Sequence, residues 1–184
     1  ESLTVTLNSG VDIENINFVP ERQTKYGQGW YNTHDPQENG GWGPLFDGTV
    51  GQVGIPDADG NIIEAPYSSL GDDHIKEFYK TGVIYQNNLN VNLGGGDSFV
   101  NFNLGNLNRD FILEGDNLNR NSFVLTAGKK INNLNVGGTF TFTNQSTKQA
   151  NVNAQTSRAD YTLLTNLLQT AANVPIEKFK DRGL

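Results

Sequence analysis

Apolar residues recur at every second position in five stretches of the chain, near 2–12, 83–93, 100–104, 123–127 and 134–142. A period of two is typical of β-strands whose two faces differ. The apolar positions are Leu3, Val5, Leu7 and Val11, then Val83, Tyr85, Leu89, Val91 and Leu93, then Val100, Phe102 and Leu104, then Phe123, Leu125 and Ala127, and finally Leu134, Val136, Phe140 and Phe142. The residues between them are mostly Asn, Thr and Ser, so the pattern predicts an all-β chain with about five antiparallel strands.

The links between these stretches alternate short and long. Tight turns are predicted at 94–97 and 132–133, whereas 110–120 is longer and polar, and 12–82 separates the first two stretches. Membrane barrels alternate short periplasmic turns with long extracellular loops, and their strands need about 9–11 residues. We therefore expect a transmembrane β-barrel segment with its apolar face toward lipid and its Asn/Thr face toward the lumen. A soluble sandwich, with the apolar face as its core, is the alternative.

The long stretch between the first two strands is acidic. Residues 12–77 contain twelve acidic side chains and three basic ones, a balance of −9, which leaves +2 for the rest of a chain whose net charge is −7. Nucleic-acid binding needs the opposite charge. We predict a long acidic extracellular loop over 12–82 and no nucleic-acid partner; a plain solvated loop explains the charge equally well.

A second local pattern follows the last strand. Leucines and one alanine repeat at helical spacing, at Leu163, Leu164, Leu167, Leu168 and Ala171. Ser157 and Asp160 resemble a capping box, and Pro175 ends the pattern. The sequence predicts a short amphipathic loop helix over 157–174.

Few residue types that support catalysis or metal binding are present. The chain has no Cys and no Met, which excludes disulfides and Cys-based zinc sites, and it has no apolar run of transmembrane-helix length. His34 and His74 are predicted to be surface loop residues, and 57–61 is predicted to be a turn and not a calcium loop. We expect neither an enzyme nor a bound metal or cofactor, and the chain is expected to be cut from a longer one.

The long loop carries aromatic residues that stack on sugars or partner proteins when exposed, or pack the loop against itself when buried. The candidates for substrate or partner contact are Trp30, Tyr31 and Trp42, with Tyr26 and Gln28 in a folded turn beneath them. Both interpretations remain open from the sequence.

Several short runs point to a known family: 23–29 (QTKYGQG), 41–44 (GWGP), 46–48 (FDG), 75–82 (IKEFYKTG), 106–109 (NLNR) and 118–123 (LNRNSF). In order and spacing, across nearly the whole chain, they resemble SusC/RagA-type TonB-linked (TonB-dependent) outer-membrane transporters. The resemblance implies a plug domain inside a 22-stranded barrel of a Gram-negative outer membrane. Residues 1–184 then correspond to a partial barrel domain, the first strands after the plug.

The resemblance also implies function and partners. Such proteins import oligosaccharides or peptides, powered through TonB, and a SusD-like surface lipoprotein caps the barrel. The implied partners are that lipoprotein, TonB through the plug region, the rest of the barrel and outer-membrane lipid. The chain departs from the family in lacking the plug, the TonB-contacting segment and most of the barrel. The alternatives are a soluble β-sandwich glycan-binding module, or a barrel-wall segment held by an outer-membrane assembly or secretion complex.

Overall fold

The computed structural model describes residues 2–54, 56, 59–149 and 163–179. The chain divides into two compact units. We call the first, from 1–15 and 81–150, the strand unit, and the second, from 16–80 and 151–184, the loop unit.

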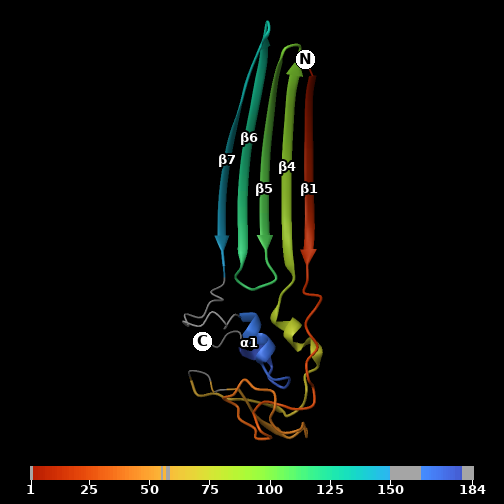
Figure 1. Cartoon of the computed structure of the whole chain (residues 1–184), viewed down its shortest axis with the longest axis vertical. Coiled ribbons are helices and arrows are strands. Elements are labelled where there is room, and N and C mark those ends of the chain that lie inside the picture. The colour runs from red at the N-terminus through yellow and green to blue at the C-terminus, as the bar shows by residue number, and fades with distance from the viewer. Residues whose placement is uncertain (1, 55, 57–58, 150–162, 180–184) are drawn as a thin grey trace. The chain divides into compact units, whose positions relative to one another are not determined.

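The strand unit is one antiparallel sheet (Figure 1). Its strands are β1 (Ser2–Glu14), β4 (Gly82–Gly95), β5 (Ser98–Asp110), β6 (Asn117–Ile131) and β7 (Leu134–Lys148), in the order β1-β4-β5-β6-β7. The prediction of an all-β chain is confirmed, since each of the five alternating stretches forms a strand. The strands have 13 to 15 residues and exceed the predicted stretches, because pairing continues through their polar ends.

Both predicted tight turns are two-residue hairpins. Gly96 has φ 58° and Asn132 has φ 55°, the left-handed conformation that two-residue hairpin turns require. The connection between β5 and β6 is shorter than the predicted 110–120, because Asp110 still pairs with Asn117 and only 111–116 remain outside the ladder.

The loop unit contains its own secondary structure and core. Its elements are the hairpin β2 (Val50–Val53) and β3 (Ile63–Pro66), the 3-10 helix η1 (Asp72–Phe78), α1 (Leu163–Gln169) and the 3-10 helix η2 (Ile176–Phe179). Ile75, Leu167 and Ile176 form a buried cluster joining η1, α1 and η2. The long predicted loop thus folds around apolar side chains from two distant parts of the chain.

The loop helix ends earlier than predicted. It ends at Gln169, well before Pro175, while Ser157 and Asp160 lie outside the described residues. The chain leaves the helix because its next groups bind elsewhere: the Ala172 carbonyl accepts from the Leu70 N–H at 2.9 Å. Among the described residues, no helix has the length and apolar character needed to cross a membrane.

The prediction that His74 is a surface residue is wrong. Its side chain is 3% exposed; Nδ1 lies 2.8 Å from the Gly71 carbonyl oxygen, and Nε2 lies 3.4 Å from Nη1 of Arg22. Burial follows from its place in η1, next to the fully buried Ile75. His34 is half-buried, with its ring against Tyr67 at 5.1 Å. Within the described residues no group of three His or carboxylate side chains is placed to hold a metal ion.

Candidate functional site

The sheet has two chemically different faces. Residues opposed in the ladder point to the same side, and Leu89, opposite Leu7 and Leu104, lies on an apolar face. This face also holds Val91, Phe102, Leu125, Val136 and Phe140, as predicted. The opposite face holds Asn90, Asn101, Asn103 and Thr141, also as predicted. The apolar side chains are open: Leu7 is 67% exposed and Phe140 is 59% exposed.

The apolar side chains form a band that is slanted relative to the strands. On β1 the band runs from Leu3 to Ile13, and on β7 it runs from Leu134 to Phe142. To compare positions on different strands, we define the level of a residue as the number of the β4 residue that lies beside it across the sheet. The band centres then fall at levels 88, 88, 91, 93 and 93 for β1, β4, β5, β6 and β7. The band therefore shifts by 93 − 88 = 5 residues across the sheet. Single polar positions interrupt it at Ser9, Asn87 and Lys129.

Asparagines mark the border of the band on β5 and β6 that lies away from the two hairpin turns. Asn106 donates from Nδ2 to Oδ1 of Asn121 at 2.7 Å, and Asn121 donates to Asn119 at 3.0 Å. Asn119 donates to Asn108, which donates back to Asn106 at 2.9 Å. The four amides form a closed ring of hydrogen bonds directly beyond Leu104 and Phe123, so the change from apolar to polar takes place within one residue pair.

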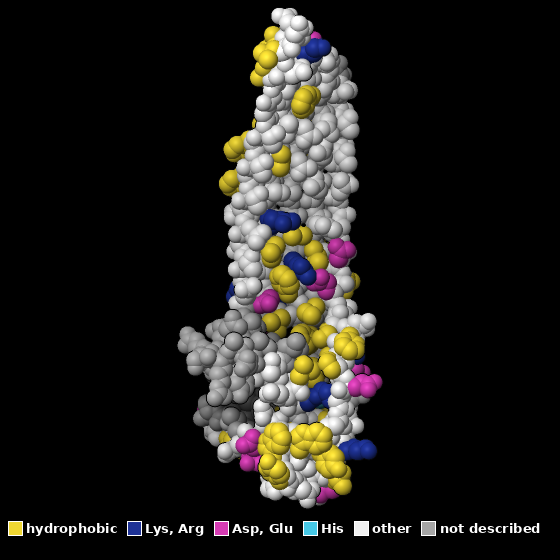
Figure 2. Space-filling model, viewed as in Figure 1, with side chains coloured by type: hydrophobic (Ala, Val, Ile, Leu, Met, Phe, Trp, Pro, Cys, Tyr) yellow, Lys and Arg dark blue, Asp and Glu magenta, His cyan; other side chains and the backbone are white. Residues whose placement is uncertain are grey.

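The second face of the sheet is polar. Figure 2 shows few hydrophobic side chains over the part of the sheet turned toward the viewer. Amides bridge neighbouring strands here: Asn103 Nδ2 donates to Asn88 Oδ1 at 2.8 Å, and Asn101 donates to Asn92. Such a surface offers many donors and acceptors at fixed spacing, which suits contact with water or hydroxylated solutes.

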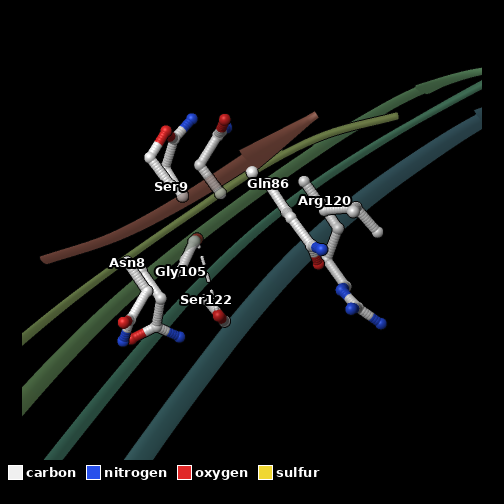
Figure 3. Close-up of a pocket in the computed structure, with 11 residues that line it drawn as sticks. Asn8, Ser9, Gln86, Gly105, Arg120 and Ser122 are labelled. Atoms are coloured by element: carbon white, nitrogen blue, oxygen red, sulfur yellow. Dashed lines mark hydrogen bonds between the residues drawn. The ribbon is translucent and has the colours of Figure 1, made fainter. Parts of the chain in front are cut away.

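One hollow of about 380 Å³ opens on this polar face (Figure 3). Side chains from four strands line it on that face: Asn8, Gln86, Asn88, Leu107, Arg120 and Ser122, with Gly10 and Gly105 between them. Sequence reasoning did not single out these residues. The available signal was the placement of glycines at two polar-face positions of otherwise alternating strands.

In the loop unit, Gln28 is the buried centre of the predicted site. It is 4% exposed, and its Nε2 donates to the carbonyls of Pro36 at 3.1 Å and Glu38 at 2.6 Å. Its Oε1 accepts from the Gly54 N–H at 3.2 Å, and its backbone N–H donates to Oδ1 of the fully buried Asn173 at 2.8 Å. Gln28 therefore ties three segments together and has almost no surface for a ligand.

The indole of Trp30 is fixed from two sides. A Cβ on Gly40 would lie 2.2 Å, 2.4 Å and 2.6 Å from Cε2, Nε1 and Cζ2, and such similar distances place Gly40 over the ring face. Nε1 donates to Oε2 of Glu38 at 3.1 Å. Trp30 remains 42% exposed, so the ring is held rigidly while part of it faces solvent.

The structure brings Trp30 and Trp42 together. Both line a hollow of about 450 Å³ that also holds polar side chains from Arg22, Gln23, Asn39 and Gln169. Trp42 is 55% exposed, and the ring of Tyr26 lies 6.0 Å from it at 39°. The floor is glycine backbone at Gly40 and Gly41.

Tyr31 lies apart from this hollow. It is 95% exposed at the tip of a turn in which Trp30 and Thr33 exchange backbone hydrogen bonds of 3.2 Å and 2.9 Å. Tyr31 and Asn32 have φ 52° and 60°, a conformation that is unfavourable for a bulky residue such as tyrosine. Tyr31 lines a separate hollow with Trp30, Thr33, Asp35 and Glu38.

Tyr67 and Asp47 in the loop unit have shifted pKa values. Burial, with a smaller effect of the Asp47 charge, raises the pKa of Tyr67, whose hydroxyl lies 3.2 Å from the Pro44 carbonyl oxygen. Hydrogen bonds from the Thr49 side chain and backbone lower the pKa of Asp47. A Cβ on Gly27 would lie 2.4 Å from Tyr67 Cζ, so this glycine makes room for the tyrosine. Both shifts report the internal packing of the loop unit.

Compared with known proteins, the chain matches no family model and no curated protein sequence.

Proposed function

We propose that this chain forms part of the barrel wall and the outer loops of a SusC/RagA-type TonB-dependent importer in a Gram-negative outer membrane. The single observation that carries the proposal is the slanted apolar band on the open face of the sheet. An apolar face this exposed needs a cover, and lipid covers such a face in a barrel wall.

The slant supports a tilted sheet in a flat apolar layer. Crossing from β1 to β7 takes four inter-strand steps, about 19 Å at about 4.8 Å each. If the strands tilt by about 40° from the membrane normal, the residues that lie at one depth in the membrane are displaced along the strand direction by about 16 Å between β1 and β7. That distance is about five residues at about 3.3 Å each, and the band centres shift by 93 − 88 = 5 residues.

The length of the band agrees with the same reading. It covers nine positions on β7, from Leu134 to Phe142, and eleven on β1, from Leu3 to Ile13, but only five on β5, from Val100 to Leu104. A transmembrane β-strand needs about 9–11 residues. Asp97 and the turn at 132–133 lie beyond the band at the turn end, and the asparagine ring lies at the opposite border on β5 and β6, whereas Lys129 is a charged position inside the band.

In the proposed importer, the polar face lines the lumen. The outer edges of β1 and β7 lack strand partners among the described residues, and the remaining barrel strands of a longer chain pair with them. The loop unit lies outside, where Trp30 and Trp42 contact the solute or a SusD-like lipoprotein. TonB acts through the plug region.

The experiment uses the absence of cysteine from residues 1–184. Single cysteines replace Asp59 in the loop unit and Asp97 in the β4–β5 turn, and whole cells are treated with a thiol reagent that does not cross membranes. We expect labelling at position 59 and none at 97 until the cells are opened. The reverse pattern, or equal labelling of both, would contradict the proposed orientation.

One observation favours a second function, a soluble glycan-binding module. The hollow between Trp30 and Trp42 combines aromatic rings with amide donors and acceptors, a combination that suits a sugar ring. In that case the apolar face of the sheet is covered by another protein layer. A full-length protein that is monomeric without detergent and binds glycan would support the module over the importer.

A further inference from the structure

The hollow on the polar face has walls of defined chemistry. Two successive levels of the ladder form it: Asn8, Asn88, Gly105 and Ser122 at one level, and Gly10, Gln86, Leu107 and Arg120 at the next. In Figure 3, Asn8, Gln86, Arg120 and Ser122 lie on one side of the strands, and Ser9 lies on the other.

Glycine gives the hollow its depth. A Cβ on Gly105 would lie 2.5 Å from Ser122 Oγ and 3.8 Å from Asn88 Nδ2, so any side chain there would occupy the floor. A Cβ on Gly10 would lie 3.6 Å from Cγ and from Nε2 of Gln86, an ordinary van der Waals distance, so the tight position in the hollow is Gly105. The volume of about 380 Å³ lies within the range of about 300–1,000 Å³ that is usual for small-molecule sites.

Arg120 supplies a positive charge without a local counter-ion. Its guanidinium makes no salt bridge or hydrogen bond to the described residues, and the residues that line the hollow include no carboxylate. Arg109, on the same face, differs: it donates from Nε and Nη2 to Glu14 at 3.2 Å and 2.7 Å. One arginine of this face is therefore neutralised within the sheet, whereas the other is available to an anion.

The neutral groups around Arg120 are oriented for hydroxyl contacts. Asn88 accepts at Oδ1 from Asn103 at 2.8 Å, which directs its Nδ2 donor away from that bond. Gln86 donates from Nε2 to Asp12 at 3.2 Å, which leaves its Oε1 as an acceptor. A guanidinium fork matches a planar carboxylate with two parallel hydrogen bonds.

We propose that this hollow binds the carboxylate of a hydroxylated solute, such as an acidic sugar, with Arg120 holding the carboxylate and Asn88, Gln86 and Ser122 contacting the hydroxyls. The proposal rests on the proposed function, in which this face lines the path of the solute. It narrows the solute class from oligosaccharides or peptides in general to those that carry a carboxylate beside hydroxyl groups.

The test measures the binding of two matched probes by calorimetry, with the full-length protein in detergent. Digalacturonate carries the carboxylates, and its methyl ester keeps the hydroxyls without the charge. We expect the acid to bind about 10- to 100-fold more tightly than the ester, the range expected for hydrogen bonds to a charged group. The preference should weaken as salt is raised.

Three variants locate the effect. Arg120→Gln should remove the preference for the acid and leave ester affinity unchanged, whereas Gly105→Ala should weaken both probes by filling the floor. Lys130→Gln, which removes an exposed charge on the same face near the turn, is the control and should change neither. Circular dichroism verifies that each variant keeps its sheet.

Equal affinity for the acid and the ester, no binding of either probe, or an unchanged preference in Arg120→Gln would each overturn the inference. A different result would contradict the proposed function. If the protein stays monomeric without detergent, the membrane assignment is wrong, whatever the probes do. If it requires detergent but does not prefer the acid, only the carboxylate site is wrong.

Discussion

Replacing neighbouring residues of β4 by arginine tests which face of the sheet meets lipid. Val91 lies on the apolar face between Val5 and Phe102, within a few residues of the band centre, and Asn90 lies on the polar face between Thr6 and Asn103. The two positions are adjacent on the same strand and lie at nearly the same depth. Any difference between Val91→Arg and Asn90→Arg therefore reports the surroundings of each face.

The expected magnitudes follow from the surroundings. An arginine on the lipid face near the bilayer midplane costs about 2–4 kcal/mol of folding free energy. The polar face is lined by asparagine and threonine, so Asn90→Arg should cost much less. Without lipid the difference should nearly vanish, because Val91 is only partly buried within the chain itself. The lipid dependence therefore separates membrane exposure from ordinary core packing.

The assay is reversible urea unfolding of the full-length protein in lipid vesicles. With urea m-values of about 1–3 kcal/mol/M, the Val91→Arg midpoint should fall by on the order of 1 M or more relative to Asn90→Arg. Equal losses of stability in the two variants, or a larger loss for Asn90→Arg, would refute the assignment of the apolar face to lipid.

Three further predictions concern the loop unit. Replacing Trp30 and Trp42 together by alanine should abolish binding of glycan or lipoprotein, measured by pull-down, at an unchanged melting temperature; loss of stability alone would mean that the rings only pack the loop. Gly40→Ala should cost about 1–3 kcal/mol and change the near-ultraviolet dichroism, since its Cβ would strike Trp30, whereas Gly51→Ala, with open space around it, should have little effect. Because hydrogen bonds lower the pKa of Asp47, its contribution to stability is present above the ordinary carboxyl pKa and is lost as the pH falls through the lowered value; an NMR titration of Asp47 at or above its ordinary value would contradict this.

The sheet was predictable from the sequence because one constraint determines it. A strand with unlike faces must alternate, so the alternation alone assigns residues such as Leu89 and Asn90 to opposite faces, without knowledge of the register. The two hairpin turns were also predictable, because Gly96 and Asn132 are residue types that accept the positive φ these turns need. The exact strand ends were not predictable, because the polar ends continue the ladder without an apolar signal.

The loop unit was less predictable because its order comes from contacts distant in sequence. Oδ1 of Asn173 accepts from the Gln28 N–H although the two residues are 145 positions apart in the sequence, and no local sequence pattern predicts that bond. His74 is buried likewise in η1, whose Ile75 shares a core with the distant Leu167 and Ile176. The hollow around Arg120 was not predictable, because it combines residues from four strands and only the strand register brings them together.

Spin-label scanning in lipid vesicles tests the slanted band most directly. Spin labels are placed at the apolar-face positions of β1 from Leu3 to Ile13 and of β7 from Leu134 to Phe142. For each label, the accessibility to oxygen, which concentrates in lipid, is compared with the accessibility to a polar nickel complex, which stays in water. For a tilted barrel wall we expect maximal lipid exposure near residue 8 on β1 and residue 138 on β7, which are levels 88 and 93 of the ladder and thus 5 residues apart. Maxima at the same level on both strands, or labels that meet the nickel complex throughout, would contradict a tilted barrel wall.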